Sequence, residues 1–446
     1  MQITARVVLC MLVSCCVLPS LGFAEVSTST ARTINETVKL AIFSHPKIHA
    51  ELKAYRAEYS RLTEVESGFL PKVSLGLGIG RERSNNTLTR AVTNSGTKTL
   101  QRKETSITLN QMLFDGFKTH WQRKGQLKVI EAQQAALRNL MSETALKAIN
   151  SHLLVAMDNK ILSFNIANLT AHQTISKEIE VRVRSGKDDY AKVSQVSARL
   201  SLSLANVEAA RNKVFKVSAD YSRDVGQAPS KKLYFQNKLF KLPNNKMEFL
   251  NNAMHANLLL ASQMEKKEAS VAIAKAANNT DYPSLFLQSG ATWNNNLDGI
   301  VGRNNDAFIM LRMNYDLFKG GADKAAKKYA SLLSQKANYE LDDARRVIRR
   351  DAAQAWFDYQ SGTKRVAYLQ DYVESARNTL KAYNKQFNIG QRTLIDLLDA
   401  ENELLRAKRT MVEAQKELYL SKYQILNLNG TLLSTLSFDE TGLIDE

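Results

Sequence analysis

The sequence predicts a mixed α/β protein made of two copies of one unit, each with two short strands and one very long helix. Three observations predict this fold. The segment Leu113–Gly116 (LFDG) recurs as Leu317–Gly320 (LFKG), 204 residues later. Runs of alternating apolar and polar residues precede both segments, which is the pattern of half-buried strands. No proline occurs in 72–228 or 284–446. Because interior proline breaks helices, very long helices are permitted there.

The first 24 residues are predicted to be a secretory signal peptide. Arg6 supplies the positive start, a largely apolar run follows, and small residues precede the cleavage point after Ala24. The alternative is a lipoprotein signal, since 12–15 resembles a lipobox ending at Cys15. The apolar run continues past Cys15 to Phe23, which favours cleavage after Ala24. All three cysteines lie in this segment, so the mature chain would have no disulfide.

The repeat extends well beyond the LFDG segment. Gly186 pairs with Gly390 at the offset of 204, and Pro71 pairs with Pro283 at an offset of 212. The eight-residue difference predicts a longer loop in the first copy. The predicted organisation is a signal peptide at 1–24, a first repeat at 25–228, a connector at 229–246, a second repeat at 247–432 and a disordered tail at 433–446.

Four strands are predicted from alternation of period two. They cover 73–79, 107–113, 285–293 and 309–317. Period two with one apolar face fits a soluble antiparallel sheet and a sheet in a membrane equally well. No run of 18 apolar residues follows the signal, so no transmembrane helix is expected.

The helices are predicted from length and from heptad spacing. The long ones, 117–184 and 321–388, have 68 residues each, or about 100 Å at 1.5 Å per residue. The return helices, 191–226 and 392–429, and the shorter helices, 33–69 and 247–281, are about half as long. Coiled-coil packing is predicted from two heptad rows, Leu397, Leu404, Met411, Leu418 and Ile425 with Ala400, Ala407, Ala414, Ser421 and Leu428.

Four strands cannot close a barrel, and open strand edges are avoided in proteins. A symmetric oligomer would remove the edges. Three chains would supply twelve strands, enough for a water-filled lumen.

The most specific motif begins at Gly390, where the second long helix is expected to turn into its return helix. Gly390 is followed six residues later by Asp396-Leu397-Leu398-Asp399-Ala400. With the repeated order of proline, strand and LFxG, this motif resembles the outer-membrane efflux protein family, the TolC-type channels of Gram-negative bacteria. The resemblance covers nearly the whole mature chain. It implies a mixed α/β membrane protein that forms a homotrimer, in which a twelve-stranded outer-membrane β-barrel with four strands per chain continues into a long periplasmic α-helical coiled-coil barrel. It also implies docking with a periplasmic adaptor protein and an inner-membrane transporter.

The resemblance places Asp396 and Asp399 at the periplasmic entrance. Residues three apart share a helix face, so three chains would bring six carboxylates around the opening and favour cations. The alternative is ordinary acids at a helix start, which complement the helix dipole. The turns between each long helix and its return helix are named the tips. The resemblance also assigns the tips to contact with the adaptor, through Gly186, Gly390, Phe387, Arg392 and Thr393.

The family often joins neighbouring tips through an arginine, here Arg392, and an aspartate of the first repeat. That aspartate position is Lys192 here, and an aromatic hydroxyl that often precedes the second tip glycine is replaced by Phe387. Asp188 or Asp189 is therefore the expected partner of Arg392 in a latch between helices.

No catalytic residue, cofactor or metal site is predicted. The six histidines include no pair with a suitable metal partner, since His45 and His49 lack the acidic centre of a zinc motif. The net charge is +17, but an exported chain is not expected to bind nucleic acid, whereas outer-membrane lipid is an expected partner. The predicted function is a passive export channel, favouring type I protein secretion. Alternatives are a drug or metal efflux channel, a soluble periplasmic coiled-coil binding protein and a secreted enzyme.

Overall fold

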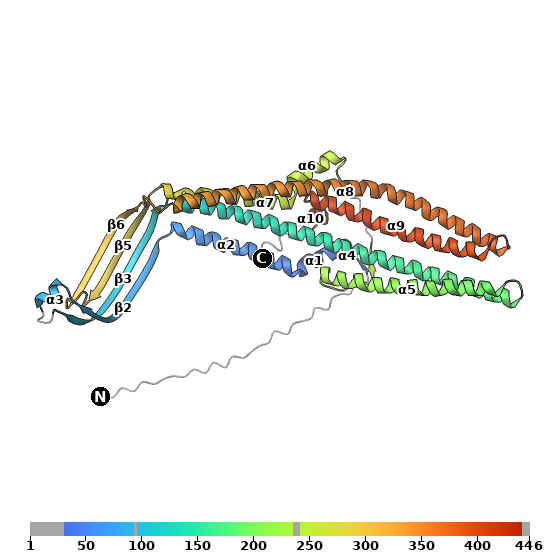
Figure 1. Ribbon diagram of the computed structural model, residues 1–446, viewed down its shortest axis with the longest axis horizontal. Coiled ribbons are helices and arrows are strands. Elements are labelled where there is room, and N and C mark those ends of the chain that lie inside the picture. Colours follow the sequence, from blue (N-terminus) through green and yellow to red (C-terminus); the bar gives the residue numbers. More distant parts are fainter. Residues whose placement is uncertain (1–30, 93–95, 235–240, 439–446) are drawn as a thin grey trace, which may run out of the picture.

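The computed structural model describes residues 31–92, 96–234 and 241–438. The chain is strongly elongated, with a sheet at one end and paired helices that reach their turns at the other end (Figure 1). The predicted signal peptide at 1–24 lies outside the described residues.

The sheet has the four predicted strands, β2 (Lys72–Ser84), β3 (Lys98–Phe114), β5 (Ser284–Asn295) and β6 (Arg303–Asn314). Their order is β2-β3-β5-β6, and every neighbouring pair is antiparallel. The strands are longer than predicted, because polar residues beyond the apolar runs continue the pairing. The outer edges of β2 and β6 pair with no other described strand.

The two faces of the sheet differ in character. On β2, Val73, Leu75, Leu77 and Ile79 are 60–74% exposed on one face, which we name the apolar face. Residues paired across strands share a face, so the register adds Ile107, Leu109, Leu287, Trp293, Ile309, Leu311 and Met313 to it. The other face, named the polar face, carries residues such as Ser106, Thr108, Gln288, Thr292 and Asn304.

Each repeat has one long helix and one return helix, as predicted. The long helices α4 (Lys118–Arg184) and α8 (Ala322–Asn388) have 67 residues each. The return helices are α5 (Tyr190–Val225) and α9 (Leu394–Leu428). Both long helices start and end 204 residues apart, so the internal repeat is confirmed element by element. The predicted heptad rows of α9 are largely buried, including Leu397, Leu404, Ala407, Ala414 and Ile425.

The prediction of one continuous shorter helix per repeat is wrong. The segment 33–69 divides into α1 (Ile34–Ser44) and α2 (Pro46–Glu66), and 247–281 divides into α6 (Lys246–Ala256) and α7 (Leu258–Ala276), each pair followed by a 3₁₀ turn. Proline disfavours helical geometry in the residue before it, and His45 is extended. In the second copy the Asn257 side chain accepts from two backbone N–H groups and starts a new helix.

The junction between sheet and long helix is tight in the first repeat only. Gly116 has φ +69°, and an added Cβ would lie 2.6 Å from the backbone oxygen of Asn279. Its equivalent Gly320 has φ +60° with open space around it. Phe117, which precedes α4, also has a positive φ of 63°. Its ring packs edge-on against Phe114 at 5.2 Å between centroids, which offsets the strain of that backbone conformation.

The strands β1 (Ala31–Arg32) and β4 (Lys232–Leu233) and the helix α3 (Thr87–Val92) were not predicted. A two-residue parallel pair joins β1 to β4 in the connector. Helix α3 lies in the polar loop between β2 and β3.

Helix α10 (Leu432–Thr435) packs Leu433 and Leu436 into the core beside α1 and α4. The prediction of a disordered tail starting at 433 is therefore wrong for 433–438, because buried leucines hold this segment against the helices. Residues 439–446 lie outside the described residues.

Candidate functional site at the hairpin tips

Two helix turns form the end of the molecule farthest from the sheet (Figure 1). α4 turns into α5 at Gly186, with φ +68°, and α8 turns into α9 at Gly390, with φ +78°. Both values require the left-handed conformation, in which glycine carries no steric penalty. The structure therefore places the two predicted tip glycines at equivalent turns of the two repeats.

Asp396 caps its own helix. The Thr393 hydroxyl accepts from the Asp396 N–H at 3.2 Å, and the Asp396 carboxylate accepts from the Thr393 N–H at 3.2 Å and its hydroxyl at 2.8 Å. This reciprocal pair is a capping box. The hydrogen bonds from Thr393, helped by Arg392 3.9 Å away, lower the pKa of Asp396. The alternative of a helix-start acid thus describes Asp396 in this chain.

Asp399 makes a different contact, across the two repeats. Its Oδ1 lies 3.0 Å from Nη2 of Arg199 on α5. The ion pair therefore links the return helix of the first repeat with that of the second. Asp396 and Asp399 share a helix region, but one carboxylate is directed to a cap and the other to a neighbouring hairpin.

The expected latch does not form within the chain. Asp188 pairs with Lys192 four residues later. Asp189 instead caps α5, accepting from the N–H of Ala191 at 3.3 Å. Within the described part of one chain both acids serve their own hairpin and neither binds Arg392, so a latch between the tips of neighbouring chains stays a prediction.

Arg392 is held by its own hairpin as well. Its Nε donates to Gln386 Oε1 at 3.0 Å, and its guanidinium lies over the Tyr383 ring, 4.3 Å from the centroid. Phe387 is buried among the apolar residues that join the tips, and the guanidinium of Arg182 lies 4.8 Å from its ring centroid. The prediction that the Phe387 side chain is a contact for a partner is therefore contradicted by its burial. Arg392, Thr393 and both tip glycines remain exposed.

Sequence reasoning missed Arg199, although a signal was present. At the offset of 204, Lys192 corresponds to Asp396 and Arg199 to Glu403. The first return helix thus has cations one heptad apart where the second has acids. Opposite charges at equivalent positions of two neighbouring helices favour an ion pair between them.

A second missed feature lies inside α4. Positions seven residues apart are polar and deeply buried, with Asp158 2% exposed and His172 fully buried. We name this row the polar seam: Thr144, Ser151, Asp158, Asn165 and His172. In the second repeat the equivalent positions are Ile348, Ala355, Gly362, Leu369 and Ala376.

The polar seam joins α4 to α5 through charged groups. The Ser151 hydroxyl donates to Asp224 Oδ2 at 2.6 Å, and Lys213 Nζ lies 3.1 Å from Asp158 Oδ1. Burial lowers the pKa of His172, so its ring is held neutral. Polar residues at core positions fix the register of a coiled coil at a cost in stability. The first hairpin is thus built for register, and the second for apolar packing.

Within 31–92, 96–234 and 241–438, no group of three or more metal-ligating side chains comes together. In the same ranges no helix combines the length and the hydropathy needed to cross a membrane.

Comparison with known proteins identifies the family. A model described as outer membrane efflux protein matches residues 38–219 and again 250–431. The outer membrane efflux protein BepC of Brucella suis is 25% identical over 415 residues, covering 92% of this chain and 88% of that relative. The outer membrane protein TolC of Vibrio cholerae is 23% identical over 415 residues, covering 90% and 91%.

Two further matches bear on the comparison. The alkaline protease secretion protein AprF of Pseudomonas aeruginosa is 27% identical over 125 residues, 28% of this chain and 26% of that relative. The crystal structure of the CmeC outer membrane channel of Campylobacter jejuni has a TM-score of 0.77 at 13% identity, covering 90% of this chain and 86% of that chain. Since the family model covers both repeats, this chain belongs to the outer membrane efflux protein family and is a protein of the outer membrane.

Proposed function

We propose that three copies of this chain form a passive exit duct across the outer membrane and the periplasm. The observation that carries the proposal is the open sheet, whose outer edges on β2 and β6 pair with no other described strand and whose apolar face is exposed. An exposed flat edge and a broad apolar face are both unfavourable in water. Pairing between chains would cover the edges, and lipid would cover the face.

The strand directions support closure. With four consecutive antiparallel strands, β2 and β6 run in opposite directions. The β6 of one chain can therefore pair antiparallel with the β2 of the next, and three chains continue one pattern through twelve strands. The polar face would then line the lumen.

The helical part would continue the duct to the tips, which we propose as its entrance. Asp396 and Asp399 remain the proposed lining residues of this entrance. The contacts of each suggest different roles, since the Asp396 carboxylate is engaged in its cap while Asp399 is neutralised by Arg199. Separating the hairpins would release three Asp399 carboxylates into the opening and make it favour cations.

We propose that the tips dock with a periplasmic adaptor, which in turn joins an inner-membrane transporter. Exposed apolar side chains support a protein contact there, because Val181, Tyr190 and Ile389 are 63–73% exposed around the two turns. Their neighbours Gly186, Gly390, Arg392 and Thr393 are exposed too. The energy for export would come from the transporter, and the duct itself would have no catalytic activity.

The favoured cargo is a polypeptide exported by type I secretion. The name of the relative AprF, alkaline protease secretion protein, supports a secreted protein as the cargo. The name of BepC, outer membrane efflux protein, supports the second candidate, a drug or metal efflux channel. The soluble binding protein considered from the sequence is set aside, because the family is one of outer-membrane proteins.

The duct is tested by native mass spectrometry and by conductance in planar bilayers. A trimer that conducts is expected, and a monomer without conductance would refute the proposal. The cargo is tested by deleting the gene and comparing the secreted proteins with the sensitivity to toxic compounds. Loss of a secreted protein at unchanged drug sensitivity supports type I secretion, and the reverse result supports efflux.

A further inference from the structure

A group of cations lies on the apolar face of the sheet, at the end remote from the helices. We name it the cationic belt: Arg81, Arg83, Lys103 and Arg303. Arg81 and Arg83 follow Ile79 at intervals of two on β2, and so stay on the same face. Lys103 pairs with Ile79, and Arg303 lies in the same row through Asn295. All four side chains are therefore directed to the face that carries the apolar residues.

The register gives the spacing within the belt. Neighbouring strands lie about 4.8 Å apart, so Lys103 and Arg303, two strands apart, are separated by about 10 Å. Arg81 is the diagonal neighbour of Lys103, at about 7–8 Å. Three cations within such distances suit a ligand with more than one phosphate group, because each phosphate accepts from several donors.

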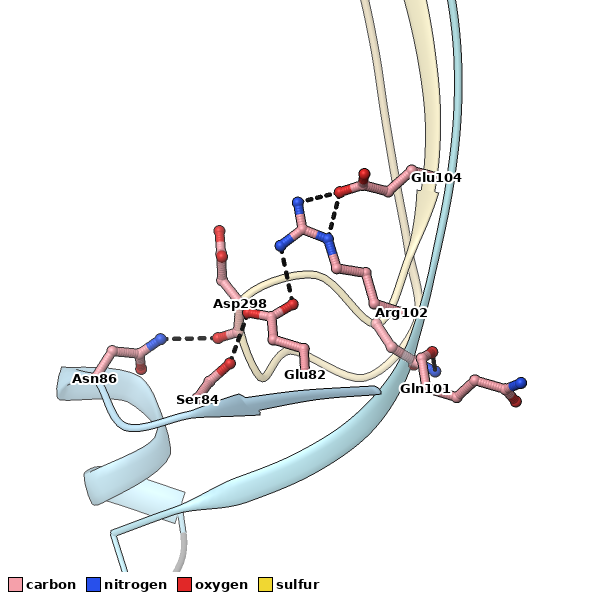
Figure 2. A network of polar contacts seen from close by, with 8 residues as sticks. Glu82, Ser84, Asn86, Gln101, Arg102, Glu104 and Asp298 are labelled. Carbon is pink, nitrogen blue, oxygen red and sulfur yellow. Dashed lines mark hydrogen bonds and ion pairs between the residues drawn. The ribbon is translucent and has the colours of Figure 1, made fainter. Parts of the chain in front are cut away.

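The belt has no counter-charge in the described part of the chain. Arg81, Arg83, Lys103 and Arg303 are exposed and form no ion pair there. Arg102 on the polar face differs, as Figure 2 shows, because it binds Glu82 at 3.0 Å and also Glu104, while the neighbouring Gln101 points away from this network. The chain thus neutralises Arg102 on the polar face with two acids and leaves the belt unneutralised.

The acidic residues of the sheet also separate the polar face from the apolar face. The acids of the four strands are Glu82, Glu104 and Asp306, and the register places all three on the polar face. At the opposite end of the sheet the junction carries aromatic rings instead, with Phe114, Phe117 and Tyr282 in mutual edge-on contact. Only one margin of the apolar face is therefore cationic.

We propose that the cationic belt binds the phosphate groups of lipid headgroups in the outer leaflet of the outer membrane. This inference depends on the proposed function, in which the apolar face meets lipid and the helices extend into the periplasm. Arg81 lies two residues beyond Ile79, or about 7 Å along the strand. That displacement matches the headgroup layer, which adds about 5–7 Å on each side of the hydrocarbon core. Long cationic side chains also extend readily toward such a layer.

In the proposed trimer the belt becomes continuous. The β6 of one chain lies beside the β2 of the next, so Arg303 approaches Arg81 and Arg83 of the neighbouring copy. Lipids bound there would contact two chains at once. The belt would then hold bisphosphorylated lipids across each boundary between chains.

The test is native mass spectrometry of the full-length trimer titrated with three probes: bisphosphorylated lipid A, its dephosphorylated form and inorganic phosphate. The first variant combines R81Q, R83Q, K103Q and R303Q. The matched control removes the same charge from exposed helix cations that form no ion pair among the described residues, with K160Q, K177Q, K216Q and R349Q. Conductance and trimer mass are recorded for every sample.

Each cation near an anionic surface contributes about fivefold in affinity, and salt reduces this. We expect wild-type trimers to prefer the bisphosphorylated lipid by about a hundredfold, the belt variant to lose this preference, and the control to keep it. Equal binding of both lipids to wild type, or full preference in the belt variant, overturns the inference. Inorganic phosphate binding as tightly as the lipid also overturns it. If any of these results is obtained with trimers that still conduct, only the lipid inference fails and the proposed duct stands. Failure of the wild-type chain to form trimers would refute the duct itself.

Discussion

The ion pair between Arg199 and Asp399 is expected to hold the two hairpins of each chain together. At 3.0 Å, unlike unit charges in water attract by about 1.4 kcal/mol. Both side chains are partly exposed, at 40% and 59%, so side-chain ordering and solvent reduce the net contribution to about 0.7 kcal/mol. Three pairs in the proposed trimer stabilise the closed tips by roughly 2 kcal/mol, about thirtyfold in the equilibrium between closed and open.

Reversing one charge tests this reasoning. Arg199→Asp and Asp399→Arg should each raise the open probability in planar bilayers by about thirtyfold or more, because repulsion replaces attraction. The double reversal should restore closure. The difference in open probability between each single reversal and the wild type should shrink as KCl rises from 0.1 M to 1 M, since the screening length falls from about 10 Å to about 3 Å.

The matched control is Lys192→Asp with Asp188→Lys, which reverses an ion pair inside one hairpin. It should leave the open probability unchanged. Single reversals at Arg199 or Asp399 that conduct like wild type would refute the reasoning, as would a double reversal that stays open.

Three further outcomes follow from local geometry. Burial lowers the pKa of His152 to about 4, so between pH 6.5 and 4 the unfolded chain binds a proton that the folded chain does not. The contribution of His152 to the free energy of unfolding should therefore be complete above pH 6.5 and fall by roughly 3 kcal/mol toward pH 4. Denaturant titrations of His152→Gln should lack this dependence on pH. Gly116→Ala should prevent trimer assembly, because its Cβ would lie 2.6 Å from the backbone oxygen of Asn279. Gly320→Ala should cost only about 1–2 kcal/mol of backbone strain. Equal yields of trimer from the two variants would contradict this expectation. Gly290→Ala places a Cβ 2.9 Å from the Phe308 ring; the variant should lower the melting temperature, and adding Phe308→Ala should recover part of the loss.

Much of the architecture could be predicted because it depends on local and periodic signals. The offset of 204 fixed both long helices, and alternation located the four strands of the sheet. The break before Asn257 was missed because only its hydrogen bonds to the next turn, not a proline, create it. The full length of β3 was missed because polar residues carry its outer half.

The candidate site was less predictable, because its contacts join elements far apart in the sequence. Gly186 and Gly390 follow from the repeat alone. The pairing of Arg199 with Asp399 depends on how two hairpins lie side by side, and the family pattern pointed to Arg392 instead. Asp396 could have been assigned to a cap from its distance to Thr393, since that spacing is the signature of a capping box.

The constant offset between the two repeats restricts how the length of the duct can change. A helix turns by about 100° and rises 1.5 Å per residue, so one inserted residue in α4 would rotate the polar seam away from α5 and lift one tip above the other. An insertion or deletion of seven residues keeps the polar seam directed at nearly the same side of the helix and moves a tip by about 10 Å. It would have to occur in α4, α5, α8 and α9 together to keep the tips level. The reach of this chain toward its partners is therefore adjustable only in coordinated steps of one heptad.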